Sequence, residues 1–93
     1  MKNVSDFPKL KSSYLKMRKE EECLIINNME LEIFFLNRSS AIIFMLILDS
    51  NTVESALVKY ECLYKDKISK DILIIDFEEC IKDLLHKKLF IVM

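Results

Sequence analysis

The first half of the chain shows the hydrophobic patterns of short β-strands. Residues 14–18 alternate between apolar and polar, which predicts a half-exposed strand. Residues 23–26 are apolar on both faces, which favours a central strand. Residues 31–36 are rich in β-branched and aromatic side chains and end at the turn-forming Asn37. Because residues 27–30 form an Asn-based hairpin turn, we expect three antiparallel strands.

From residue 41 onwards the apolar residues recur at helical spacing. Residues 41–48 form an apolar run that Ser39 or Ser40 can cap, and a helix that is apolar all round is expected to be buried. A capping-box pattern at residues 51–54 opens the next helix. The third helix follows Ser69 and carries one wide apolar stripe. That stripe consists of Leu73, Ile74, Phe77, Cys80, Ile81, Leu84 and Leu85.

The two ends of the chain differ in character. Residues 1–12 are mostly polar and lack periodicity, so we expect a flexible lead-in followed by one domain over residues 13–93. Residues 89–93 form an apolar tail that should pack back on the domain. The first residues contain no apolar signal segment, and the longest apolar run has eight residues where a membrane span needs roughly 20. A cytoplasmic protein without a membrane contact is expected.

Composition removes several classes of site. The chain has 93 residues, a net charge of −1 and no glycine, which excludes Gly-rich phosphate loops and leaves positive φ angles to Asn, Asp or Lys. The widely spaced Cys23, Cys62 and Cys80 fit neither a disulfide framework nor a zinc site, so we interpret them as reduced, mostly buried thiols. No cofactor and no metal are predicted.

No catalytic constellation is apparent. His86 lies among lysines at a helix end, where it suits the helix dipole better than catalysis. Cys80 lies in an apolar stripe, where burial makes a thiol inert. We therefore expect a protein that is not an enzyme.

The order and spacing of these elements resemble the PqqD-like family, small domains also called precursor-peptide recognition elements. The resemblance covers about residues 8–92 and is carried by three short patterns. They are Leu36-Asn37 before the first helix, Thr52-Val53-x-x-Ala56-Leu57 in the second, and Asp76-Phe77-x-x-Cys80-Ile81-x-x-Leu84 in the third. Family members often have Gly where this chain has Asp49-Ser50 and Lys88-Leu89, which leaves those helix ends uncertain. The resemblance implies an α+β fold, a winged helix-turn-helix with a three-stranded antiparallel N-terminal sheet followed by three helices.

The resemblance also implies a function, the binding of the leader of a ribosomally synthesised and post-translationally modified peptide (RiPP). The leader would pair with the third strand, lie against the third helix, and be presented to a separate tailoring enzyme. The residues agree in part, because a two-sided apolar strand at a sheet edge offers unpaired backbone groups to another chain. The expected peptide-binding residues are Leu31, Glu32, Ile33, Phe34, Phe35, Leu36, Asp76, Phe77, Cys80, Ile81, Asp83, Leu84 and Lys87.

Within this set the residues have different expected roles. Groove walls are expected from Ile33 and Phe35 of the strand and from Phe77, Cys80, Ile81 and Leu84 of the helix. The rim is expected from Asp76, Asp83 and Lys87. A helical apolar stripe usually forms core first, so the same spacing favours Phe77, Ile81 and Leu84 as core residues.

Two other functions stay open. A winged helix suggests a DNA-binding regulator, but the third helix carries more Asp and Glu than Lys and has no Arg, which disfavours contact with phosphates. A small docking subunit of a larger enzyme could use the same strand edge, and homodimerisation through that edge is a further alternative. No nucleic-acid partner is predicted.

Overall fold

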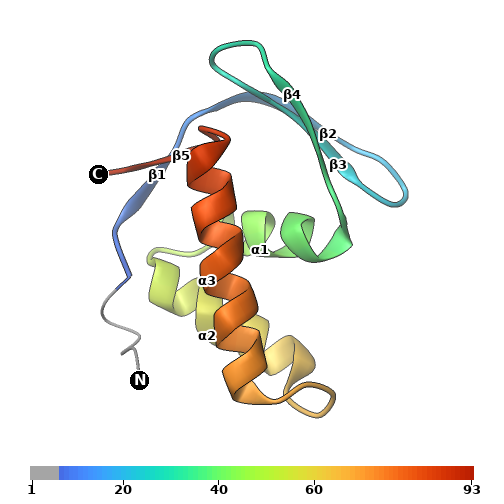
Figure 1. Cartoon of the computed structure of the whole chain (residues 1–93), viewed down its shortest axis with the longest axis vertical. Helices are drawn as coiled ribbons and strands as arrows, with labels where there is room; N and C mark the ends of the chain where they lie inside the picture. The colour runs from blue at the N-terminus through green and yellow to red at the C-terminus, as the bar shows by residue number, and fades with distance from the viewer. Residues whose placement is uncertain (1–6) are drawn as a thin grey trace.

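The fold is described from a computed structural model of the 93-residue chain, in which residues 7–93 are described. It is an α+β arrangement of three helices and two antiparallel sheets (Figure 1). The elements are β1 (Leu10–Ser12), β2 (Tyr14–Lys19), β3 (Leu24–Asn28), β4 (Ile33–Leu36), α1 (Arg38–Asp49), α2 (Val53–Tyr64), α3 (Lys70–His86) and β5 (Phe90–Val92).

The larger sheet contains the three predicted strands in the order β2-β3-β4, both pairs antiparallel. This confirms β3 as the central strand and β4 as an edge strand. The start of β4 differs from the prediction, because the strand begins at Ile33 and not at residue 31. Leu31 has a φ of 68°, a left-handed conformation that belongs to the turn and cannot continue a strand.

The smaller sheet pairs β1 with β5, joining the two ends of the described chain. The expectation of a flexible lead-in is therefore wrong for its last part, and residues 1–6 of that lead-in lie outside the described residues. Phe7 is buried and meets the Phe77 ring edge-on, with 5.7 Å between ring centroids. The apolar tail packs back as expected, since Leu89 and Phe90 are both buried.

Two of the three helices have caps that lie one to three residues from the predicted ones. The side chain of Asn37, and not of Ser39 or Ser40, caps α1 by accepting a hydrogen bond from the Ser40 N–H. In α2 the cap is Thr52, one residue after Asn51, the first residue of the predicted capping box. Ser69 holds the cap position of α3 as predicted, without a side-chain hydrogen bond. In each case a residue with a short polar side chain starts the helix.

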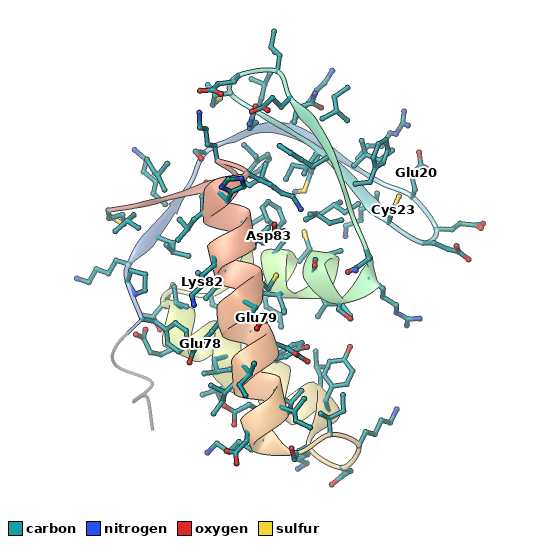
Figure 2. The ribbon with its side chains drawn as sticks, in the orientation of Figure 1. Glu20, Cys23, Glu78, Glu79, Lys82 and Asp83 are labelled. Atoms are coloured by element: carbon teal, nitrogen blue, oxygen red, sulfur yellow. The ribbon has the colours of Figure 1, made fainter. Side chains whose placement is uncertain are left out.

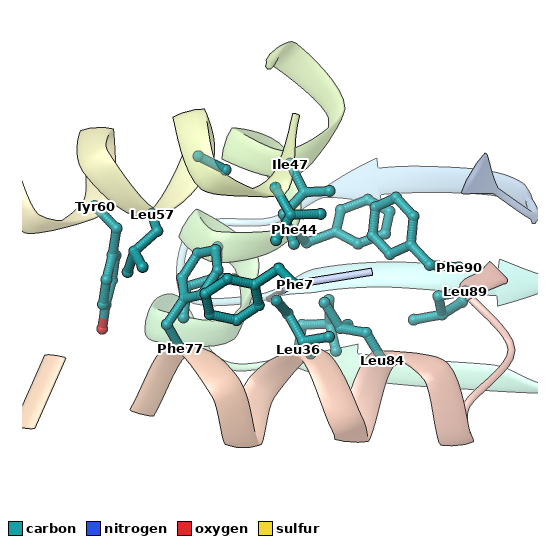
Figure 3. Close-up of a cluster of buried hydrophobic side chains, with 14 of the residues drawn as sticks. Phe7, Leu36, Phe44, Ile47, Leu57, Tyr60, Phe77, Leu84, Leu89 and Phe90 are labelled. Atoms are coloured by element: carbon teal, nitrogen blue, oxygen red, sulfur yellow. The ribbon is translucent and has the colours of Figure 1, made fainter. Parts of the chain in front are cut away.

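The core lies where the three helices meet the inner face of the larger sheet, and Figure 3 shows a part of it. Phe44 of α1 contacts Tyr14 and Phe90 with ring centroids 5.7 and 5.1 Å apart. Phe77 of α3 contacts Tyr60 of α2 with ring centroids 5.8 Å apart. Aromatic contacts thus connect both sheets to α1, and α2 to α3. Among the described residues, none of the helices is long and apolar enough to cross a membrane.

Candidate functional site

The strand β4 has a partner on one side only. Its residues pair with β3 in the register Asn27↔Ile33, Ile26↔Phe34, Ile25↔Phe35 and Leu24↔Leu36. The Asn28 N–H donates to the Glu32 carbonyl at 3.1 Å, so Asn28 and Glu32 form a hydrogen-bonded pair. Hydrogen-bonded pairs alternate along an antiparallel ladder, so the backbone N–H and C=O groups of Ile33 and Phe35 point to the open edge.

The outer face of β4, turned away from the helices, is apolar and exposed. Ile33 and Phe35 are 59% and 68% exposed. Their β3 neighbours on this face are Asn27 and Ile25, and Lys16 and Arg18 follow on β2. A shallow pocket of about 460 Å³ includes Ile33 and these β2 and β3 residues, with Phe35 outside it. The outer face therefore offers apolar side chains beside a cationic strand.

The inner face of β4 carries Phe34 and Leu36. Leu36 is buried in the core, while Phe34 is half-buried under the end of α3. The Lys87 ammonium lies 5.6 Å from the centroid of the Phe34 ring, and the same ammonium pairs with Asp83 at 2.6 Å. Phe34, and not Ile33 or Phe35, is thus the β4 side chain that faces α3. The sequence-based face assignment fails because both faces of the strand are apolar.

The predicted residues of α3 divide into two groups. Phe77, Ile81 and Leu84 are at most 4% exposed and belong to the core, so they are not walls of an open groove. Their helical spacing points them at α1, α2 and the inner side of the sheet. Asp76 and Asp83 are exposed, and Cys80 and Lys87 are half-buried. Only this second group offers atoms to a ligand, and Figure 2 shows where Asp83 lies along α3.

The turn that leads into β4 depends on Asn28, which is completely buried. Its side-chain oxygen accepts hydrogen bonds from the N–H groups of Glu30 and Glu32 at 2.9 and 3.0 Å. Its side-chain nitrogen donates to the Glu32 carboxylate at 2.8 Å and to the Lys87 carbonyl at 3.0 Å. Asn28 thus fixes the start of β4 to the end of α3. Sequence analysis placed Asn28 only in a turn, although positions 24, 26 and 28 share the inner face of β3.

A surface ion pair supports the same turn. The Lys88 ammonium lies 2.7 Å from the Glu30 carboxylate, and this hydrogen bond holds the pKa of Glu30 below its usual value and raises the pKa of Lys88. Lys88 has a φ of 61° and Leu31 a φ of 68°. Lys88 fits the expectation for a chain without glycine, whereas Leu31, an exposed branched residue, was not foreseen. Two residues with a left-handed backbone conformation therefore lie beside the contact between the start of β4 and the end of α3.

Cys80 lies beside α1, where burial raises the pKa of its thiol to about 11, against a smaller lowering by a hydrogen bond with the Ser40 side chain. The expectation of an inert thiol agrees with this shift. Cys62, in contrast, is exposed and not buried as expected. Among residues 7–93, no group of three His, Cys, Asp or Glu side chains could hold a metal ion.

We expect Cys80 to react with iodoacetamide at pH 8 about a hundredfold more slowly in the folded protein than in urea, because a rise of its pKa from 9.0 to about 11 removes thiolate by that factor. Peptide mass spectrometry at timed intervals measures both rates. In urea the two cysteines should react alike. Equal rates for Cys80 in the folded protein and in urea would contradict its burial.

No protein-family model, curated protein or solved structure matches this chain. The resemblance to the PqqD-like family therefore stays a prediction that rests on the sequence patterns.

Proposed function

We propose that this protein is a peptide-binding adaptor that holds the leader of a RiPP precursor peptide for a separate tailoring enzyme. The observation that carries the proposal is the open edge of β4. Ile33 and Phe35 offer outward-pointing backbone groups there and leave their side chains exposed. A peptide would bind by adding a fourth strand, with backbone hydrogen bonds for affinity and alternate side chains for specificity.

The surroundings of the edge support a two-sided recognition of the peptide. On one side of the added strand, its side chains would lie beside Ile33 and Phe35. On the other side they would approach Phe34 and the ion pair of Asp83 with Lys87, which is 2.6 Å long. Alternate peptide residues would then be apolar on the outer side and polar or mixed on the inner side.

The proposal includes the finer features that the resemblance implies. The three strands and three helices would form a winged helix-turn-helix, and the protein would act in the cytoplasm without chemistry of its own. The charges of α3 favour a peptide over DNA as the ligand. The exposed residues Asp71, Asp76, Glu79 and Asp83 would repel phosphates along most of that helix.

The test is a fluorescence-anisotropy titration of the protein into a labelled short peptide encoded beside its gene. Saturable binding with a Kd of about 1 μM or tighter, absent for a scrambled peptide of the same composition, is the expected result. Equal binding of both peptides, or of neither, would contradict the proposal.

We expect Phe35→Asp to weaken binding of this peptide about tenfold, because an apolar cross-strand neighbour is lost and a charge is placed beside the added strand. The fold should persist, since Phe35 is 68% exposed. Glu79→Ala, an exposed change on α3, serves as the control with unchanged affinity. Circular dichroism checks both variants, and an unfolded Phe35→Asp protein would show that Phe35 stabilises the core.

A further inference from the structure

A second surface lies away from β4, between the β2–β3 turn and α1. It is an open groove of about 500 Å³. Residues 19–24 of the hairpin form one wall, and α1, from Arg38 to Asp49, forms the floor and the opposite wall. Figure 2 shows Glu20 and Cys23 in this hairpin end, which extends past α1. No residue of β4 or α3 lines the groove, so it is separate from the proposed peptide edge.

The floor of the groove is an apolar face of α1 that the rest of the described chain covers only in part. Ile43, Phe44 and Ile47 of this helix are buried in the core. The residues Ala41, Ile42, Met45 and Leu46 lie on another face, are only half-buried, and line the groove. The apolar run of α1 therefore serves two faces, of which the protein itself buries one. Met45, with Cys23 on the opposite wall, adds side chains that adapt to different partners.

The rim of the groove is acidic. Glu20, Glu21, Glu22 and Asp49 stand against two cations, Lys19 and Arg38, which leaves an excess of two negative charges. Glu20 is also paired with Arg18 at 2.9 Å, while Glu21 and Glu22 are exposed in the turn. A ligand that covers this groove would gain from positive charges placed around an apolar centre.

We propose that this groove docks an amphipathic helix of a partner protein, with an apolar face and flanking Lys or Arg residues. The four floor residues are spaced i, i+1, i+4 and i+5, a ridge against which apolar side chains of a second helix can pack. The open shape and the charges on both walls suit the face of a helix better than an enclosed small molecule. This proposal does not rest on peptide binding at β4.

The probe is a synthetic helix of about 18 residues with Leu on one face and Lys on the other, and its matched control replaces every Lys by Glu. Titration of the ¹⁵N-labelled protein, followed by NMR chemical shifts, locates the contact. Saturable shifts at residues 19–24 and 41–46 with the Lys peptide alone are expected. Shifts elsewhere, no shifts, or equal binding of the Glu peptide would overturn the proposal.

Two variants of the groove sharpen the test. The double variant Glu21→Lys, Glu22→Lys should raise the Kd about tenfold, because two attractive exposed pairs become repulsive. Asp66→Lys makes the same type of charge change in the exposed α2–α3 loop and should leave the Kd unchanged. Met45→Arg should abolish binding because it places a cation among the apolar floor residues. The variant should still fold, because the long stem of Arg lets its charge reach water. Unchanged binding by the double variant would overturn the proposal.

Discussion

Asn28→Leu is expected to lower the free energy of unfolding by about 3 kcal/mol. Leu has a similar volume but removes all four side-chain hydrogen bonds of this buried residue. The N–H groups of Glu30 and Glu32 and the carbonyl of Lys87 then lose a partner, which costs more than the bonds are worth in exchange with water. For a domain whose total stability is about 5–15 kcal/mol, the loss is roughly a fifth to three fifths of it.

Urea unfolding followed by circular dichroism measures the change, with Asn27→Leu as the control. Asn27 neighbours Asn28 but lies on the outer face of β3, so its replacement should cost less than about 0.5 kcal/mol. Similar losses of unfolding free energy in both variants would show that the buried hydrogen bonds of Asn28 do not stabilise the fold.

A third variant, Asn28→Asp, keeps the shape of the side chain but replaces its N–H donor by a titratable carboxylate. The carboxylate would be completely buried beside Glu32 and the Lys87 carbonyl, and we expect this to raise its folded-state pKa by more than the N–H groups of Glu30 and Glu32 lower it. A raised folded-state pKa means stability that is present at low pH and lost as the pH rises. Relative to the unchanged protein, this variant should therefore be least destabilised in acid.

Local patterns in the sequence were enough to predict most of the elements. Such patterns depend only on neighbours along the chain: alternation located β2, short apolar runs located β3 and β4, and apolar residues at helical spacing located the helices. The edge position of β4 was a premise of the peptide-binding hypothesis, and the strand order β2-β3-β4 agrees with it. The same reasoning left the boundaries uncertain, because Asn37, Ser39 and Ser40 are all competent caps.

Contacts between distant segments could not be predicted in this way. The strand β1 exists because residues 10–12 pair with residues 90–92 at the opposite end of the chain. Ser13 is fixed by the same joint, with its hydroxyl donating to the Lys88 carbonyl at 2.7 Å. Three residues are too few to show a strand pattern, so a pairing with a segment so far away in sequence could not be predicted from them. Phe7, the residue that anchors this segment in the core, was therefore assigned to a flexible lead-in.

The face of β4 could not be predicted for a different reason. Ile33, Phe34, Phe35 and Leu36 are all apolar, so alternation gives two equally acceptable orientations. The turn decides between them, because Asn28 is buried and sets the register that turns Phe34 and Leu36 inward. That choice removes Ile33 and Phe35 from the side facing α3 and leaves them exposed. The exposed face of β4 is thus determined by a buried residue that does not belong to that face.

Ile33→Pro is expected to weaken peptide binding at β4 by about ten- to a hundredfold while the fold persists. Proline removes the Ile33 N–H, which points to the open edge and takes no part in the β3–β4 ladder. Ile33 is also the first residue of β4, a position where proline is tolerated in edge strands. Anisotropy with the labelled peptide measures the affinity, and Ile33→Ala, which keeps the N–H, should lose much less.

Phe34→Pro tests the alternation on which this prediction depends. The Phe34 N–H belongs to a hydrogen-bonded pair with Ile26, so proline there should break the ladder and cost about 3 kcal/mol or more of stability. If Ile33→Pro unfolds the protein and Phe34→Pro does not, the edge groups are those of Phe34 and the strand presents its other set of donors. If Ile33→Pro folds and binds the peptide as tightly as Ile33→Ala, the peptide does not bind as an added strand, and side-chain contacts alone must hold it.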